Sequence, residues 1–272
     1  MPELPEVETL RRSLAPIVGR KVLSATLHRR DVLTLPTRGR VLPEHLLVGA
    51  KFKELRRRGK QMAVVAGDGR VLLIHLGMTG QVRHGLVSKK EVHTHATWNL
   101  DDGSSVYFND PRRFGGLWFF PNLAALDERW VELGPDALTI SGGELAMRAK
   151  DSKRAIKAVL LDQTVLAGVG NIYADEALFE SGISPRRLAT RMTTEGFEKL
   201  AETVRSVLER AIKAKGSTLR DYRDASGQAG SAQDGHKVYG RGGLPCLTCG
   251  TTLTQQTLAQ RTTVMCRRCQ KG

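Results

Sequence analysis

The first residues of the chain carry a group that could do covalent chemistry. Pro2 follows Met1, and removal of Met1, which is common before a small second residue, would leave a proline with a free secondary amine. An α-amino group has a reference pKa of about 7.7–8.0, so part of it is unprotonated and nucleophilic near neutrality. Such an amine forms an iminium with a carbonyl carbon, and the adjacent carboxyl of Glu3 can serve as acid or base. Taken alone, these residues more often form an ordinary polar start that leads into a helix.

The cysteines form a second group with chemical potential. All four lie in the last 27 residues, with the spacing Cys246-x2-Cys249-x16-Cys266-x2-Cys269. Two Cys-x2-Cys pairs at this separation are typical of a structural four-thiolate Zn2+ site rather than of a disulfide framework. A metal with four protein ligands keeps no open position for substrate, so we expect one structural Zn2+ and no metal catalysis.

The charge of the chain indicates a polyanionic partner. The 272 residues include 42 Lys and Arg against 28 Asp and Glu, a formal net charge of +14. Nucleic acid is favoured over a membrane surface because no stretch resembles a lipid-facing helix or a signal peptide. We therefore expect a protein of the cell interior that binds nucleic acid.

Two glycine-flanked turns place apolar residues beside arginine. Met78 follows His75 at the end of an apolar run, and Phe114 follows Arg112 and Arg113 in a second turn. Apolar side chains on such turns can fill the gap left in a duplex when a base is extruded. Each side chain, considered singly, also fits a core position. The basic run that ends at Lys60 likewise fits a solvated sheet edge.

The elements that must position these residues change character along the chain. Residues 6–18 have the periodicity of an amphipathic helix, and strand-like runs with hairpin signals follow up to about residue 121. The expected hairpins pair 62–66 with 71–76 and 96–100 with 105–108, which predicts an antiparallel sandwich or barrel. Helices are expected at 152–161, 171–181 and 194–215. The glycine-bearing turn before Asn171 fits either a phosphate seat at a helix N-terminus or an ordinary αα-hairpin.

In motif content and order the chain resembles the bacterial formamidopyrimidine-DNA glycosylases, which excise oxidised purines and cut the strand. The matching stretches run from end to end: Met1 to Thr9, His75 to Met78, Asp110 to Gly115, Gly168 to Ala174, Val238 to Arg241, and the cysteine ribbon that ends at Lys271. The resemblance implies an α+β fold with an N-terminal helix, a two-layer antiparallel β-sandwich, a helix–two-turn–helix domain and a four-Cys zinc finger. The implied domains are 1–133, a linker at 134–150, 151–236 with a mobile loop at 222–236, and 237–272.

The resemblance also implies roles for single residues. Pro2 would attack C1′ of the damaged nucleotide, and Glu3 would move protons at the sugar. Lys60 would donate a proton during β-elimination, and Arg261 would assist δ-elimination. DNA contacts are implied for seven residues: His75, Met78, His93, Arg112, Phe114, Lys153 and Asn171. The implied partner is damaged double-stranded DNA, bound by a monomer without an obligate protein partner.

Two alternatives remain at this level. An endonuclease VIII-type glycosylase shares Pro2, Glu3 and zinc but prefers oxidised pyrimidines, whereas the residues after Pro2 and the run Arg112-Arg113-Phe114 favour the purine enzyme. The loop expected to cover the flipped base is small and polar here, Gly230-Ser231-Ala232-Gln233, which departs from the family. A non-catalytic zinc-ribbon DNA-binding protein is the alternative from another class, and it would need no trimmed N-terminus.

Overall fold

The computed structural model describes residues 1–86 and 92–271, which fall into two compact units. The N-terminal unit comprises residues 1–132 and 215–231, and the C-terminal unit comprises 133–214 and 232–272. The segment 215–231 thus packs with the first unit although helical sequence separates it from that unit along the chain. The domain limits implied by the resemblance placed residues 215–231 in the helix–two-turn–helix domain instead.

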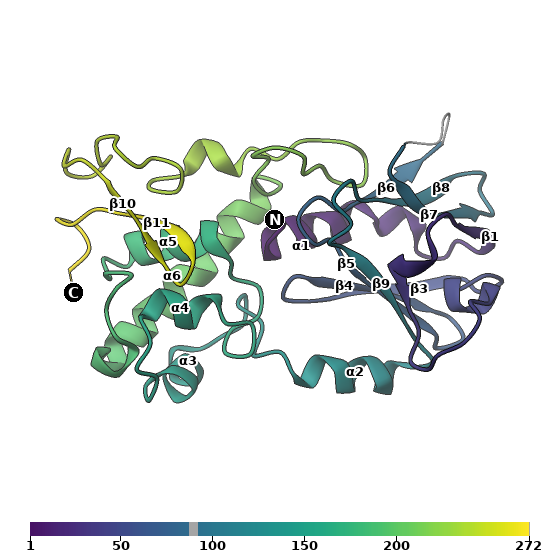
Figure 1. Cartoon of the computed structure of the whole chain (residues 1–272), viewed down its shortest axis with the longest axis horizontal. Coiled ribbons are helices and arrows are strands. Elements are labelled where there is room, and N and C mark those ends of the chain that lie inside the picture. Colours follow the sequence, from purple (N-terminus) through teal and green to yellow (C-terminus); the bar gives the residue numbers. More distant parts are fainter. Residues whose placement is uncertain (87–91, 272) are drawn as a thin grey trace. The chain divides into compact units, whose positions relative to one another are not determined.

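The N-terminal unit is a helix packed with two antiparallel β-layers (Figure 1). One layer has the strand order β1-β7-β8-β6 and the other β2-β9-β5-β4-β3, with only the β2–β9 pair parallel among the described strands. The first layer comprises β1 (Val22–Leu27), β6 (Gln81–Gly85), β7 (Thr94–Leu100) and β8 (Ser105–Asn109). The second comprises β2 (Leu33–Thr34), β3 (Phe52–Arg58), β4 (Gln61–Ala66), β5 (Val71–His75) and β9 (Gly116–Phe120). Both predicted hairpins and the sandwich are confirmed.

The core of this unit lies between the layers and under helix α1 (Leu4–Ser13). Val7 and Leu10 of the helix join apolar side chains of both sheets in one buried cluster. The helix begins two residues before its predicted start and ends at Ser13, and a short 3-10 turn, η1 (Ala15–Ile17), contains Pro16. A proline at that place lacks the N–H that an α-helical continuation requires. Helix α2 (Leu123–Val131) is the last element of residues 1–132. The unit also contains the short 3-10 turns η2 (Arg30–Val32) and η3 (Pro43–Leu46).

The C-terminal unit is helical and ends in a β-hairpin. Its helices are α3 (Gly142–Ala149), α4 (Ile156–Leu161), α5 (Asn171–Glu180) and α6 (Thr194–Lys213), and its short 3-10 turns are η4 (Ala189–Arg191) and η5 (Ala232–Gly235). The hairpin comprises β10 (Thr254–Leu258) and β11 (Arg261–Met265), and β11 packs on α5. Helix α3 lies inside the segment predicted as a linker, where a Ser141 N-cap begins it. None of the helices in the two described ranges is long and apolar enough to cross a membrane.

Candidate functional site

The N-terminus is held at the start of α1. Pro2 and Glu3 are buried, and Glu3 occupies the N-cap position of the helix. The Glu3 N–H donates a hydrogen bond of 2.8 Å to Oε2 of Glu6, one helical turn later. This pairing satisfies a backbone donor that the helix itself cannot satisfy, and so it fixes the residue that follows Pro2. A nucleophile at Pro2 and a carboxyl at Glu3 would therefore start from a defined position.

Glu6 is a functional candidate that sequence reasoning missed. Its side chain is only 2 % exposed, and its second carboxylate oxygen accepts the Ser217 N–H at 2.7 Å. Its backbone carbonyl accepts the Tyr222 hydroxyl at 3.0 Å. One carboxylate thus joins the N-terminus to the segment 215–231. The spacing of Glu3 and Glu6 signals a cap, but nothing in the sequence signals the contact with Ser217.

We expect Glu6→Gln to loosen this junction while leaving the fold intact. The amide keeps one oxygen acceptor but presents an NH2 group to the other backbone donor, which leaves that donor unsatisfied. The expected loss is about 1–3 kcal/mol of unfolding free energy. Chemical denaturation measures the loss, and increased amide exchange at Ser217 locates it. Unchanged exchange at Ser217 would contradict the assigned contact.

Lys60 and His75 meet at one end of the second sheet. Gly59 and Lys60 form the two-residue turn between β3 and β4, and Gly59 has φ 54°, a left-handed value that suits glycine in this position. Gln61, directly after the turn, pairs with His75 at the end of β5. Lys60 is only 9 % exposed, so the cation is held within the protein surface.

The environment of His75 keeps its imidazole neutral. Burial lowers the pKa of His75, and the positive charge of Lys60 lowers it further. Nδ1 accepts the Gly77 N–H at 3.3 Å, which leaves the proton of the neutral ring on Nε2. The Nε2–H of a neutral His75, beside the Lys60 ammonium, can donate a hydrogen bond to a phosphate oxygen. The structure therefore joins Lys60 and His75 in one small region of positive potential.

The two turns with exposed apolar residues are joined by Asp110. Its buried carboxylate accepts the Thr79 hydroxyl at 2.6 Å and the Gly115 N–H at 2.7 Å. Gly77 permits the close approach, because a Cβ there would lie 2.4 Å from the Phe114 carbonyl carbon. The loops that carry Met78 and Phe114 are thus fixed against each other.

The side chains on these turns face solvent. Met78 is 39 % and Phe114 59 % exposed, so neither belongs to the core. Arg112 is exposed on the Asp110 turn, and exposed His93 lies beside it, because the His93 carbonyl accepts the Asp110 N–H at 3.1 Å. The sequence was compatible with either a core or a surface position for Met78 and Phe114, and the structure places both on the surface.

In the C-terminal unit, the turn between α4 and α5 places Asn171 at the start of α5. Gln163 shapes this turn, since its amide donates to the Val169 carbonyl and its oxygen accepts the Gly168 N–H. The Asn171 amide donates to the Thr262 carbonyl of β11 at 2.9 Å. Lys153 is exposed before α4. The turn, Asn171 and the hairpin therefore form one assembly.

Arg261 lies at the tip of that hairpin. It is the first residue of β11, is exposed and pairs with Leu258 across a two-residue turn. Both turn residues, Ala259 and Gln260, have left-handed φ values of 50° and 57°, a conformation that costs non-glycine residues roughly 1–2 kcal/mol each. The hairpin ladder and its packing on α5 must offset this cost.

The sulfur atoms of the four cysteines are gathered at one point. All four Sγ atoms lie within 4.8 Å of one another, with 3.9 Å between Cys246 and Cys269 and 3.5 Å between Cys249 and Cys266. Tetrahedral Zn2+ with Zn–S distances of about 2.3 Å needs sulfurs about 3.8 Å apart. The four cysteines thus fit one structural Zn2+, and Phe179 of α5 packs against them.

Family models match three successive parts of the chain. The N-terminal domain of formamidopyrimidine-DNA glycosylase matches residues 1–117, and the H2TH domain of the same enzyme matches 133–223. A zinc finger found in FPG and IleRS matches 243–272. A formamidopyrimidine-DNA glycosylase of Desulfitobacterium hafniense (strain DSM 10664 / DCB-2) is 43 % identical over 99 % of this chain and 100 % of that protein. The chain belongs to the formamidopyrimidine-DNA glycosylase family.

Solved structures of relatives agree with this placement. The Fpg protein of Lactococcus lactis, solved in a complex with DNA that contains an abasic site, superposes on this chain with a TM-score of 0.89 at 31 % sequence identity. The match covers 99 % of this chain and 100 % of that protein. A MutM protein in complex with DNA that contains carbocyclic 8-oxo-G has the same TM-score and identity, with full coverage of both chains. The predicted fold is confirmed, and the full-length match argues against a non-catalytic zinc-ribbon protein.

The predicted site residues of this glycosylase are divided between the two units. Eight belong to the N-terminal unit: Pro2, Glu3, Lys60, His75, Met78, His93, Arg112 and Phe114. The C-terminal unit holds Lys153, Asn171, Arg261 and the four cysteines. Within the first unit Lys60 joins His75, and the Asp110 junction gathers Met78, His93, Arg112 and Phe114. The catalytic and DNA-binding roles themselves remain predictions.

We expect metal analysis of the purified glycosylase to find one zinc per chain. Thiolate ligands at these distances bind Zn2+ tightly, and the short finger has few apolar side chains of its own to stabilise it. Inductively coupled plasma mass spectrometry measures the metal content, and Cys266→Ser is expected to lower it well below one. A fully active protein free of metal would contradict the assignment.

Proposed function

We propose that this glycosylase excises oxidised purines from damaged double-stranded DNA and then cleaves the strand at the resulting site. The observation that supports this most directly is the placement of Pro2 and Glu3, buried together at the N-cap of α1, in a chain that matches formamidopyrimidine-DNA glycosylases along its length. The relatives carry the name of the purine enzyme, which favours it over the endonuclease VIII alternative.

The first chemical step uses the amine of Pro2 once Met1 has been removed. Its lone pair forms a bond to C1′ of the lesion nucleotide while the bond between C1′ and the base breaks. The base leaves with a proton, and the sugar opens to an iminium with Pro2. Glu3 transfers protons at the sugar, where a buried carboxyl beside the nucleophile is suitably placed for proton exchange.

The strand is then cut by two eliminations. The iminium accepts the electron pair released when a 2′ proton is removed, and the 3′ phosphate leaves in β-elimination. Lys60 supplies a proton and contacts phosphate, with neutral His75 as a further phosphate donor. Arg261 assists δ-elimination, in which the 5′ phosphate leaves. Water finally hydrolyses the imine and frees Pro2.

DNA is bound mainly through phosphates in this proposal. Lys153, Asn171, His93 and Arg112 contact the backbone, and Met78 and Phe114, together with Arg112, fill the space left by the flipped base. The protein acts as a monomer in the cytoplasm and associates with the nucleoid through DNA. Affinity should therefore fall steeply with salt.

Borohydride trapping on defined lesions tests the proposed reaction. Reduction of the iminium is expected to give a stable protein–DNA adduct on a duplex with 8-oxoguanine opposite cytosine. A duplex with thymine glycol opposite adenine should be cleaved more slowly. Comparable or faster cleavage of thymine glycol would favour the pyrimidine enzyme, and absence of any adduct would contradict the iminium.

A further inference from the structure

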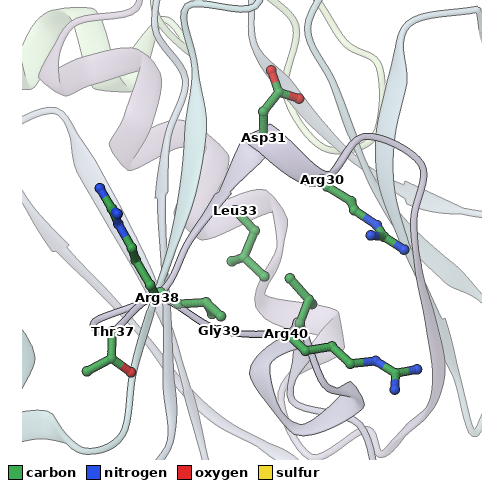
Figure 2. A pocket seen from close by; sticks show the side chains of 9 residues that line it. Arg30, Asp31, Leu33, Thr37, Arg38, Gly39 and Arg40 are labelled. Atoms are coloured by element: carbon green, nitrogen blue, oxygen red, sulfur yellow. The ribbon is translucent and has the colours of Figure 1, made fainter.

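A cavity of about 760 Å³ lies in the N-terminal unit along residues 30–41 (Figure 2). It shares no residue with the catalytic or DNA-binding sites proposed above. Its volume falls within the range of roughly 300–1,000 Å³ that is typical of small-molecule sites in proteins. The cavity is therefore large enough for a ligand of nucleotide size.

The charge around this cavity is positive and uncompensated. Arg30, Arg38 and Arg40 line it, and none of them forms an ion pair with another residue of the described ranges. Asp31 is the only acidic residue in the lining, and its carboxylate is bound by Arg29 at 2.7 Å. These three arginines thus keep no acidic partner among the described residues, and guanidinium groups are well suited to phosphate.

The floor of the cavity is apolar and fixed. Leu33 is 7 % exposed and pairs with Leu117 across the parallel β2–β9 ladder, so the sheet sets its position. Leu35 and Val41 are half-buried and pack against the same core. In Figure 2 the guanidinium groups of Arg30 and Arg40 extend toward the same side, and Leu33 lies between them and Arg38. A cationic rim over an apolar floor matches a ligand with a phosphate and a less polar body.

We propose that this cavity binds a nucleotide, with its phosphate at Arg30 and Arg40 and its sugar or base against Leu33 and Leu35. The nucleotide has two possible sources with the same chemistry: a free nucleotide, or a nucleotide of a DNA strand that extends beyond the lesion. The proposal goes beyond lesion excision and does not depend on Pro2 as the nucleophile.

The double variant Arg30→Gln/Arg40→Gln tests the cavity. Both side chains are exposed and make no ion pair in the described structure, so the fold should persist. The matched control, Arg20→Gln/Arg129→Gln, removes the same charge from the same unit at arginines paired with Asp102 and Glu132. Calorimetric titration with dGMP forms one arm, with guanosine as the ligand that lacks phosphate. The salt dependence of affinity for a long undamaged duplex forms the other.

The two arms distinguish the sources. If the nucleotide is free, the wild type binds dGMP more tightly than guanosine, and the cavity variant weakens dGMP binding by at least about tenfold while the control does not. If the nucleotide belongs to DNA, the cavity variant alone lowers the slope of log affinity against log salt by about 0.9 for each lost phosphate contact. Cavity and control variants that behave alike in both arms would overturn the proposal. Normal trapping of the lesion by the cavity variant would separate this result from any failure of the Pro2 chemistry.

Discussion

Protein with any residue left ahead of Pro2 is expected to give no borohydride-trapped adduct through its N-terminus and to lose strand cleavage. An acylated proline nitrogen is an amide, so its lone pair is delocalised and cannot attack C1′. Removal of a nucleophile costs an enzyme at least about 10³-fold in rate. Because Glu3 is fixed by Glu6 and Pro2 is buried beside it, a displaced amine has no equivalent position from which to react.

One preparation can supply both states for this test. An N-terminal extension that a protease removes immediately before Pro2 gives matched uncut and cut protein, and intact-mass analysis verifies each. Equal affinity of both for a duplex with an unreactive abasic analogue would show that DNA binding is intact. Peptide mapping then locates the adduct. Full trapping by uncut protein, with the adduct on a lysine such as Lys60, would remove Pro2 as the nucleophile.

Replacement of Lys157 by methionine is expected to destabilise the C-terminal unit by about 3–5 kcal/mol. The Lys157 ammonium is fully buried, 2.6 Å from Oδ1 of Asp175, and it donates to the Thr262 carbonyl and the Thr263 hydroxyl. Asp175 also accepts the Val264 N–H at 3.1 Å. The variant would leave Asp175 buried without its counter-ion. Since these bonds attach β11 to α4 and α5, the strand that begins with Arg261 should lose its anchor as well.

The loss of stability caused by Lys157→Met should increase with pH. Burial raises the pKa of Asp175 to about 6, against the attraction of Lys157, which lowers it. Without Lys157 the folded pKa should rise further above the unfolded value of about 3.9. A buried carboxyl with a raised pKa costs no stability while it is protonated, below its unfolded pKa. The cost grows as pH rises from the unfolded pKa to the folded pKa, because the folded state holds the proton more tightly. The deficit of the variant relative to wild type should therefore widen above about pH 6.

Urea denaturation between pH 5 and pH 8 measures both effects. The double variant Lys157→Met/Asp175→Leu removes both charges and should recover much of the loss, because no unpaired ion remains. Arg154→Gln is a suitable control, since it breaks the exposed ion pair with Asp162, worth about 0–1 kcal/mol. A deficit for Lys157→Met that is small and independent of pH would contradict a structural role for the pair.

Features that depend on neighbouring residues could be predicted from the sequence. The spacing of the four cysteines predicted a structural zinc site, because two Cys-x2-Cys pairs at this separation are typical of four-thiolate zinc fingers. The glycine-bearing turn between residues 66 and 71 and the alternation around it predicted the β4–β5 hairpin. The sequence showed only a basic run that ends at Lys60, and the structure places Lys60 in the two-residue turn between β3 and β4.

Contacts between distant segments were decided by the tertiary structure alone. Glu6 meets Ser217, Asp110 joins the turn of Thr79 to that of Gly115, and Lys157 meets Thr263, although no local pattern relates these positions. A hydrogen bond across 211 residues forms only because core packing brings its two backbones together. The segment 215–231 accordingly belongs to the N-terminal unit, against its place in the chain. The sequence by itself determined the reactive groups of this glycosylase and the order of its motifs. Long-range packing decided which of those groups are held together, because burial and hydrogen bonding act between residues that are neighbours in space.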